Sequence, residues 1–235
     1  MTEYTLDHLS ASQINLYLQC GLKYKFQYVD QIPRPFKSSG LVFGGVVHST
    51  IDWFHKQRKI GKQPTLELLY KILNADWFCQ RLGNEIRYKE GEEETKLILT
   101  AKEMISLYFN SPLNGVEDAE FPFRVPIINP ANGERLGVVL EGFIDLIEKG
   151  DVITEFKTSA KTMDPQSLED ILQLTTYSYA YRVLFGREPK LLKVVNFVKT
   201  KIPKMVVLET GREQKDHERL FYLAKEVLKG IKTGV

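Results

Sequence analysis

Three charged residues lie close together within two apolar stretches of the sequence. Asp145 lies in the first stretch, and Glu155 and Lys157 lie in the second, after a short polar turn. Burying a charge costs free energy unless the charge is paired or binds a metal ion. Two neighbouring carboxylates repel each other, whereas Mg²⁺ favours one or two carboxylates together with water and phosphate oxygens. These residues therefore indicate a divalent-cation site, at which Lys157 could orient a nucleophilic water or stabilise charge developing on a phosphate.

The relative position of these residues depends on the turn between the two stretches. If residues 149–151 form the loop of a β-hairpin, Glu148 faces Val152 and Asp145 lies opposite Glu155. A two-residue loop would instead put Asp145 out of step with Glu155. The three-residue loop is therefore the condition for bringing the two carboxylates together.

The two faces of such a hairpin differ in character, because alternate side chains of a strand point to opposite faces. One face would carry the charged residues, with Phe143, Asp145, Ile147, Ile153, Glu155 and Lys157. The other would pack a core, with Ile144, Leu146, Val152 and Phe156. In the alternative interpretation, Lys157 makes an ordinary ion pair with one of the carboxylates on a solvated sheet face.

The remaining elements would position this hairpin. Apolar residues at helical spacing predict helices over 9–29, 41–59, 64–82, 92–109, 164–184 and 213–232. The first helix would begin at a capping box of Ser10 and Gln13 and bury Ile14, Leu18 and Leu22. Strands are predicted over 119–128, 135–148, 151–158, 191–200 and 204–209. We expect one domain over 1–235, with a mainly helical portion at 1–112 and a sheet core at 113–235.

Composition limits the class of protein. The chain has 235 residues, of which 43% are hydrophobic and 26% charged, as in ordinary globular proteins. No apolar run reaches the roughly 18 residues of a membrane span, and the polar N-terminus does not resemble a secretory signal. With only two cysteines, a reduced, cytoplasmic location is the simplest interpretation.

The charge balance leaves the question of a nucleic-acid partner open. A net charge of +2 gives no overall field that demands nucleic acid, but a local basic groove could exist. Five lysines near the predicted sheet edge could hold phosphates: Lys161, Lys193, Lys199, Lys201 and Lys204. For any single one of them, an ordinary solvated lysine is the favoured interpretation.

Asp145, followed ten residues later by Glu155-Phe156-Lys157, resembles the motif of the PD-(D/E)XK nuclease superfamily, with Ile144-Asp145 in the place of its first element. Three further segments are similar to the RecB-like exonuclease branch, which includes the CRISPR-associated RecB-type exonucleases. They are LSASQINLYLQCGLKYKFQYV, FGGVVHSTIDWF and QLTTYSYAYR. The resemblance implies an α/β (α+β) fold of the restriction-endonuclease type: a central mixed β-sheet flanked by helices, with a helical N-terminal half.

The resemblance also implies roles for individual residues. Asp145 and Glu155 would bind Mg²⁺ or Mn²⁺ with the backbone carbonyl of Phe156, and Lys157 would be the catalytic lysine. His48 would complete the metal shell. Its structural alternative is a histidine satisfied within an apolar helix.

Two residues of the QLTTYSYAYR segment would support the site. Gln173 and Tyr177 are four residues apart and share a helix face. The resemblance implies that they contact DNA or the catalytic groups, whereas the alternative is plain packing. Glu120 matches an acidic position of the same branch, and a solvated carboxylate is an equal alternative for it.

Two other metal sites are disfavoured by the sequence. His48, Asp52 and His55 share one helix face, but two nitrogens and one carboxylate are a weak signal for zinc. Many members of the RecB-like branch hold an iron–sulfur cluster through one N-terminal cysteine and three cysteines near the C-terminus. Cys20 matches the first of them, and Cys79 is expected to be a small core residue, so we expect no cluster from this chain.

The function implied by the resemblance is a divalent-metal-dependent DNA nuclease. It would be an exonuclease on single-stranded DNA or DNA ends, hydrolysing phosphodiester bonds with a metal-activated water. Its partners would be DNA and proteins of repair, phage or CRISPR systems, with no membrane. The alternatives are a catalytically inactive nuclease-fold module that binds DNA or protein, and an unrelated interaction protein of helices and sheet.

Overall fold

The computed structural model describes residues 6–234. The helices are α1 (Ala11–Gln19), α2 (Gly21–Tyr24), the π-helix η1 (Lys25–Val29), α3 (Ser39–Lys59), α4 (Leu66–Gly83), α5 (Glu94–Asn110), the 3₁₀-helix η2 (Pro165–Asp170), α6 (Leu172–Phe185) and α7 (Gln214–Lys232). The strands are β1 (His8–Leu9), β2 (Lys37–Ser38), β3 (Ile86–Arg87), β4 (Val116–Ile128), β5 (Arg135–Glu148), β6 (Val152–Ser159), β7 (Leu191–Val198) and β8 (Lys204–Thr210).

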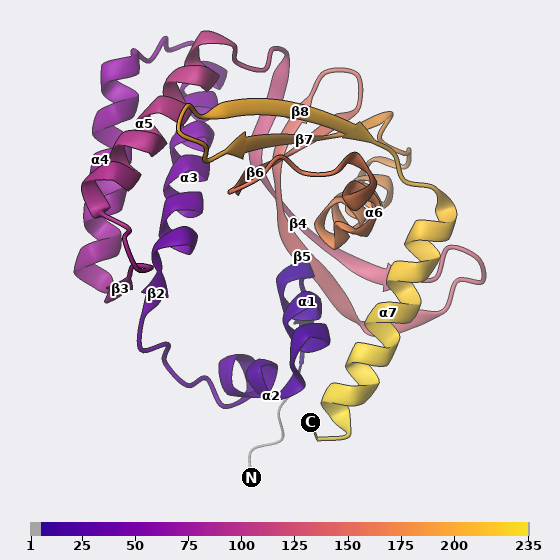
Figure 1. Cartoon of the computed structure of the whole chain (residues 1–235). Coiled ribbons are helices and arrows are strands. Elements are labelled where there is room, and N and C mark those ends of the chain that lie inside the picture. The colour runs from indigo at the N-terminus through magenta and orange to yellow at the C-terminus, as the bar shows by residue number, and fades with distance from the viewer. Residues whose placement is uncertain (1–5, 235) are drawn as a thin grey trace.

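A mixed six-stranded sheet forms the centre of the fold. Its order is β1-β5-β6-β7-β8, and β4 pairs along the whole of β5. The β6–β7 and β1–β5 pairs are parallel, and the others are antiparallel. Helices α3, α4 and α5 lie on one side of the sheet, and α6 and α7 lie on the other (Figure 1). The predicted central mixed sheet flanked by helices, with a helical N-terminal half, is confirmed.

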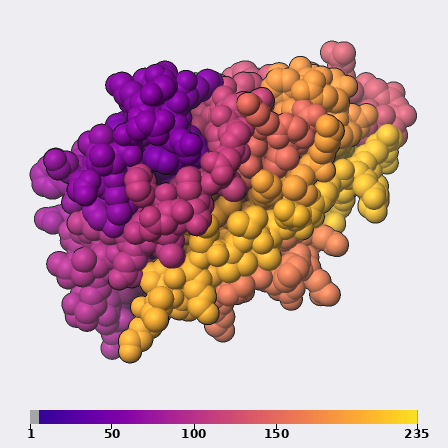
Figure 2. All heavy atoms as spheres, turned by 90° about the horizontal axis from the view of Figure 1, so that it is seen from above, coloured from indigo at the N-terminus to yellow at the C-terminus, as the bar shows by residue number. Residues whose placement is uncertain are grey.

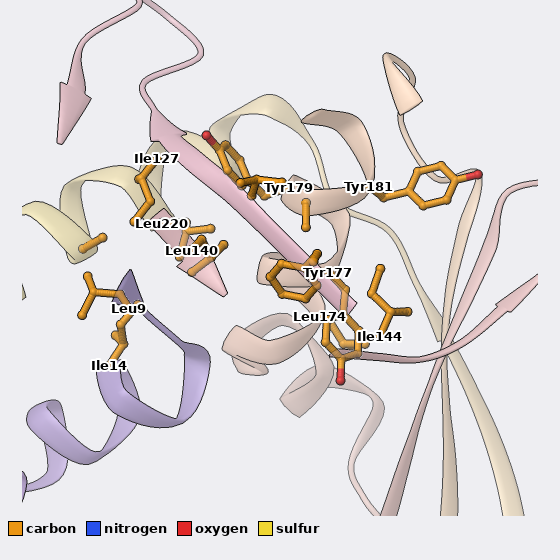
Figure 3. Packing of buried hydrophobic residues seen from close by; sticks show 14 of the residues in the cluster. Leu9, Ile14, Ile127, Leu140, Ile144, Leu174, Tyr177, Tyr179, Tyr181 and Leu220 are labelled. Atoms are coloured by element: carbon orange, nitrogen blue, oxygen red, sulfur yellow. The ribbon is translucent and has the colours of Figure 1, made fainter. Parts of the chain in front are cut away.

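Two apolar cores hold these layers together. The first joins α1, α6 and α7 to the sheet, and Figure 3 shows Leu9 and Ile14 near Leu140 and Leu220 within it. The second packs α3, α4 and α5 against the opposite face of the sheet, around Phe156. Seen from above, the last third of the chain, orange to yellow, runs as a band beside the indigo-to-magenta helical portion (Figure 2).

The predicted N-terminal helix is the largest departure in local structure. It ends at Cys20, whose backbone is extended with φ −168° and ψ 110°, and the chain continues as α2 and η1. Ser10 caps α1 by accepting the N–H of Gln13, as predicted, but the Gln13 side chain bonds to His8. Helix α1 buries Gln13 and Ile14, whereas Leu18 and Leu22 are 55% and 54% exposed, so the predicted burial of these two leucines is wrong.

The helix predicted over 164–184 is also divided. Asp164 caps η2, and α6 begins only after Ile171, whose ψ of 95° is not helical. The guanidinium of Arg212 donates to the carbonyl oxygens of Leu168 at 2.6 Å and Ile171 at 3.3 Å. These carbonyls also accept backbone N–H groups, so Arg212 adds a second donor to each and fastens both sides of the break. The predicted stop at Gly186 is confirmed, since its φ is 69°.

The other long helices and strands match their predictions, apart from end positions. The short strands β1, β2 and β3 were not predicted, because two-residue strands carry no alternation. No helix among residues 6–234 is long and apolar enough to cross a membrane.

Candidate active site

The hairpin of β5 and β6 has the predicted register. Glu148 pairs with Val152, and the next two pairs continue as far as Leu146 with Thr154. The loop therefore consists of residues 149–151, of which Gly150 and Asp151 have left-handed backbones, with φ 84° and 63°. Pairing stops immediately before Asp145 and Glu155, so the strands separate where the carboxylates lie.

The Asp145 carboxylate bridges this separation. Its Oδ2 accepts the backbone N–H of Phe156 at 2.8 Å, and its Oδ1 accepts the hydroxyl of Tyr177 at 3.2 Å. The Nδ1 of His48 lies 3.6 Å from Oδ2. Burial raises the pKa of Asp145, and the Phe156 N–H works in the opposite direction. Asp145 thus joins the hairpin to α6 and to α3.

Glu155 is a buried carboxylate with one free oxygen. It is 1% exposed, its Oε1 makes an ion pair with the Lys157 amine, and its Oε2 has no hydrogen-bond partner within residues 6–234. Burial and then the nearby Asp145 raise its pKa to about 7, against the opposing influence of Lys157. A buried carboxylate oxygen without a donor is costly, and a cation would remove that cost.

A chain of hydrogen bonds connects Lys157 back to Asp145 through helix α6. The Lys157 amine donates to Gln173 Oε1 at 2.7 Å, and Gln173 Nε2 donates to the Tyr177 hydroxyl at 2.7 Å. Tyr177 in turn donates to Asp145. Every donor points from the amine towards the carboxylate, so the chain is complementary to the charges at its two ends. The structure therefore brings Gln173 and Tyr177 to the predicted site.

Burial of the hairpin faces differs from the prediction. Ile147 and Ile153 are buried in the core on the α6 side, so the face that carries the charges also packs a core. Ile144 lies in that same core, and its predicted place on the opposite face with Leu146 is wrong. In β4, the residue between the partners of Ile144 and Leu146 is Glu120, whose φ of 48° interrupts the alternation.

The α3 side of Asp145 holds further polar residues. His48, Asp52, Glu120, Asp145 and Phe156 line a small hollow of about 10 Å³. Burial lowers the pKa of His48. Glu120 lies 3.9 Å from Lys56, and Asp52 accepts the Lys56 amine at 2.8 Å.

His55 does not share this hollow, which leaves the zinc alternative without its third ligand. Its Nε2 bonds to the Tyr108 hydroxyl at 2.5 Å, and its side chain is buried on the core side of α3. Burial lowers its pKa to about 4.

The predicted lysine and cysteine sites are mostly separate from the carboxylates. Lys193 pairs with the buried Glu148 at 2.9 Å. Lys199 lies over the Phe43 ring at 4.7 Å. The remaining three lysines are exposed: Lys161, Lys201 and Lys204. Cys20 and Cys79 are both exposed, so the expectation of a core position for Cys79 is wrong: α4 turns it towards solvent.

Sequence reasoning missed Asn196, which pairs with Lys157 across β6 and β7. Asn196 is 0% exposed, and its Oδ1 accepts the Ser159 hydroxyl at 2.8 Å. No described residue accepts from its Nδ2. The sequence signal for Asn196 was a single polar residue inside an apolar strand, because burying a polar side chain costs free energy unless it is hydrogen-bonded.

A cleft of about 390 Å³ opens beside Asp145 on the α6 side of the sheet. Strand β1 pairs with residues 139 and 140 of β5, and β6 pairs with residues 146–148. The same edge of β5 therefore has no described strand partner at residues 141–145. The cleft occupies this gap, with α1 on one side and α6 on the other.

The carboxylates fit a divalent cation by chemistry. Within residues 6–234, no three histidine, cysteine, aspartate or glutamate side chains are already gathered as a metal site. Asp145 and Glu155 nevertheless offer hard oxygen ligands, and Glu155 Oε2 lacks a partner. Lys157 lies beside them, as an ion-pair partner of Glu155.

Comparisons with known proteins show the family of the chain and agree with its fold. A family model described as the PD-(D/E)XK nuclease superfamily matches residues 8–235. A presumed exonuclease from Eubacterium rectale, solved as a crystal structure, aligns with a TM-score of 0.61 and 14% identity, over 97% of this chain and 82% of its own. SSO0001 aligns over 90% of this chain and 85% of its own, with 12% identity and a TM-score of 0.39, too low to support an inference. No curated protein matches this chain.

Proposed function

Because the chain belongs to the PD-(D/E)XK nuclease superfamily, we propose that it is a divalent-metal-dependent DNA nuclease that acts as an exonuclease on single-stranded DNA or DNA ends. We place it in the RecB-like branch on the strength of the helix that carries His48 and the helix that carries Gln173 and Tyr177. The family supports nuclease chemistry in general. The metal, the strand preference and the residue roles are our inference.

The observation that carries this proposal is the buried pair Asp145 and Glu155. Both have raised pKa values because of burial, and Glu155 also because of its neighbour. Glu155 is 1% exposed and keeps an oxygen without a partner. Such an arrangement is destabilising for a purely structural pair, and perturbed carboxylates of this kind gather at functional sites.

Asp145 and Glu155 would hold Mg²⁺ or Mn²⁺, with His48 and the carbonyl oxygen of Phe156 as further ligands. When bound, such a cation polarises the scissile phosphate and lowers the pKa of water. Lys157, which pairs with Glu155 and donates to Gln173, would stand beside the metal ligands.

The protein's own residues would then position the reacting groups. The Lys157 amine, held by Gln173 at 2.7 Å, would orient a water or stabilise charge on the phosphate oxygens. Tyr177 would fix the orientation of Asp145, because it donates to one of its two oxygens. The Phe156 N–H fixes the other oxygen. Catalysis would therefore depend on a carboxylate whose rotamer is set from two sides.

The test is digestion of end-labelled single-stranded and double-stranded DNA with Mg²⁺, Mn²⁺ or EDTA. We expect products that shorten progressively from an end with either metal, and none with EDTA. Lys157→Ala should abolish cleavage, whereas Lys62→Ala, in the exposed loop between α3 and α4, should not. Cleavage that persists in EDTA or in Lys157→Ala would overturn the assignment. DNA binding without any cleavage would favour the inactive-module alternative.

A further inference from the structure

The cleft beside Asp145 has an unusual lining for a protein that binds DNA. None of the described residues that line it is a lysine or an arginine. Most are aromatic or neutral and polar, and the only carboxylates are Glu141 and Asp145. Glu141 is paired with Arg124 at 2.6 Å. Phosphates favour lysine, arginine and backbone N–H groups, so this lining suits a flat, uncharged group better than a phosphate.

Phe143 lines this cleft with an exposed aromatic side chain. It precedes Asp145 by two residues on β5 and is 55% exposed, although it lies in the middle of a strand. Exposed aromatic side chains on a strand are the usual stacking platforms for unpaired bases. Tyr28 of η1 also lines the cleft. Phe143 has no role in the proposed hydrolysis, and its place in the cleft lining makes it available to a ligand there.

Gly142 and Phe123 form another part of the cleft lining. A Cβ on Gly142 would lie 2.7 Å from the Phe123 ring, so a side chain there would have to displace that ring. The Phe123 ring packs edge-on against Tyr177, with ring centroids 6.3 Å apart. The same tyrosine holds Asp145, so this part of the lining is continuous with the carboxylate site.

Gln13 adds a polar group at the cleft wall. Because His8 Nδ1 lies 2.7 Å from Asp7 Oδ1, we assign its proton there, and its Nε2 accepts from Gln13 Nε2 at 3.0 Å. Gln13 Oε1 is therefore an acceptor, and no described residue donates to it. Gln13 is 4% exposed, so this unsatisfied oxygen is costly. The amino or imino N–H of a nucleobase is a donor of the missing kind.

We propose that this cleft binds one unpaired nucleobase, stacked on Phe143 and facing Gln13, next to the phosphate that is cut. The inference rests on the proposed nuclease function and deepens it. Helices α1 and α6 enclose the cleft, and a base that stacks on Phe143 must leave its own stack and its partner. The substrate at the cut position is therefore single-stranded DNA or a frayed end, rather than intact duplex.

The test measures cleavage of a single-stranded oligonucleotide and of the same oligonucleotide with one abasic nucleotide placed at successive positions. We expect the wild type to cut poorly at one bond beside the abasic position. Phe143→Ala should cut intact DNA more slowly by roughly 5- to 150-fold, which corresponds to about 1–3 kcal/mol of stacking per base. On the abasic substrate the two proteins should be about equal, because the stacking partner is already gone.

Three further variants sharpen this test. Phe143→Trp should retain cleavage because it keeps a flat face, whereas Phe143→Leu should behave as Phe143→Ala. Phe78→Ala is the matched control, since Phe78 is also 55% exposed but lies on α4. The inference alone is overturned if the wild type cuts but is indifferent to the abasic position, or if Phe143→Ala matches Phe78→Ala. Failure of the wild type to cut any DNA would overturn the proposed function, and this inference with it.

Discussion

The carboxylate of Asp145 accepts the backbone N–H of Phe156 at 2.8 Å, at the point where β5 and β6 have stopped pairing. A side chain thus takes the place of the next carbonyl in the ladder. It satisfies a buried N–H while the strands separate, and the separation creates the space beside the two carboxylates. The candidate catalytic residue is therefore also a structural one.

Replacing Asp145 should separate these two roles. Asp145→Asn keeps an oxygen that can accept the Phe156 N–H, so its free energy of unfolding should stay close to that of the wild type. Asp145→Ala leaves that N–H without a partner and should cost about 1–3 kcal/mol. Both should lose at least about 100-fold in DNA cleavage. Urea unfolding and end-labelled cleavage assays measure the two effects, and equal stability of the two variants would contradict the structural role.

The hydroxyl of Tyr177 should affect turnover more than stability. Tyr177→Phe removes the donor to Asp145 and the acceptor for Gln173, both of which lie in the chain from Lys157. We expect kcat to fall by roughly tenfold, which corresponds to about 1.4 kcal/mol for a lost hydrogen bond, with little change in KM. If Tyr177 had only a structural role, Tyr177→Phe would lower the melting temperature without a selective fall in kcat. The matched control is Tyr222→Phe on α7, which is 52% exposed.

Sequence patterns predicted the β5–β6 hairpin and the neighbouring positions of its charged residues, because both depend on residues close together in the sequence. A three-residue loop with Gly150 determines the register, and the register determines that Asp145 and Glu155 lie side by side. The common helix face of Gln173 and Tyr177 follows from helical spacing alone, and their contact with the hairpin agrees with it.

Features that depend on tertiary contacts were not predictable from these patterns. The divided helix at Ile171 is stabilised by Arg212, about forty residues further along the chain. Ile144 lies in the core on the α6 side, next to the point where Glu120 of the neighbouring strand has a left-handed backbone. Asn196 lies beside Lys157 because β7 pairs with β6. In each case the decisive partner is distant in sequence, so no local periodicity reports it.

His48 should contribute to metal binding, whereas Asp52, one helical turn away, should not. His48 Nδ1 lies 3.6 Å from Asp145 Oδ2. Asp52 accepts the Lys56 amine through Oδ2 at 2.8 Å, and although its buried Oδ1 has no partner among the described residues, no ion pair or hydrogen bond joins it to Asp145 or Glu155. In titration calorimetry with Mn²⁺, His48→Ala should weaken affinity by at least about tenfold, and Asp52→Asn should leave it close to the wild-type value. A large loss of affinity in Asp52→Asn would instead favour a site on the α3 face alone.

Glu155 should make the stability of the metal-free protein depend on pH. Its pKa is raised from 4.5 to about 7 in the folded state, chiefly by burial. Between these values the folded protein holds a proton that the unfolded chain has released, so this group's contribution to stability falls as pH rises through the window. Glutamine cannot titrate. The free energy of unfolding of Glu155→Gln should therefore rise relative to that of the wild type from pH 4.5 to 7, and the difference should reach roughly 3 kcal/mol at pH 8.

Comparing the variant with the wild type at each pH cancels the opposing contribution of the buried His55 and His217. Burial lowers the pKa of both to about 4, so their contribution to the stability of the folded protein decreases as pH falls below about 6.5. Glu103→Gln, at an exposed position on α5, is the control and should show no such window. Mn²⁺ should stabilise the wild type at pH 8 much more than Glu155→Gln, because the variant lacks one of the two carboxylate ligands. A pH-independent difference between Glu155→Gln and the wild type would contradict the buried, proton-binding state of this carboxylate.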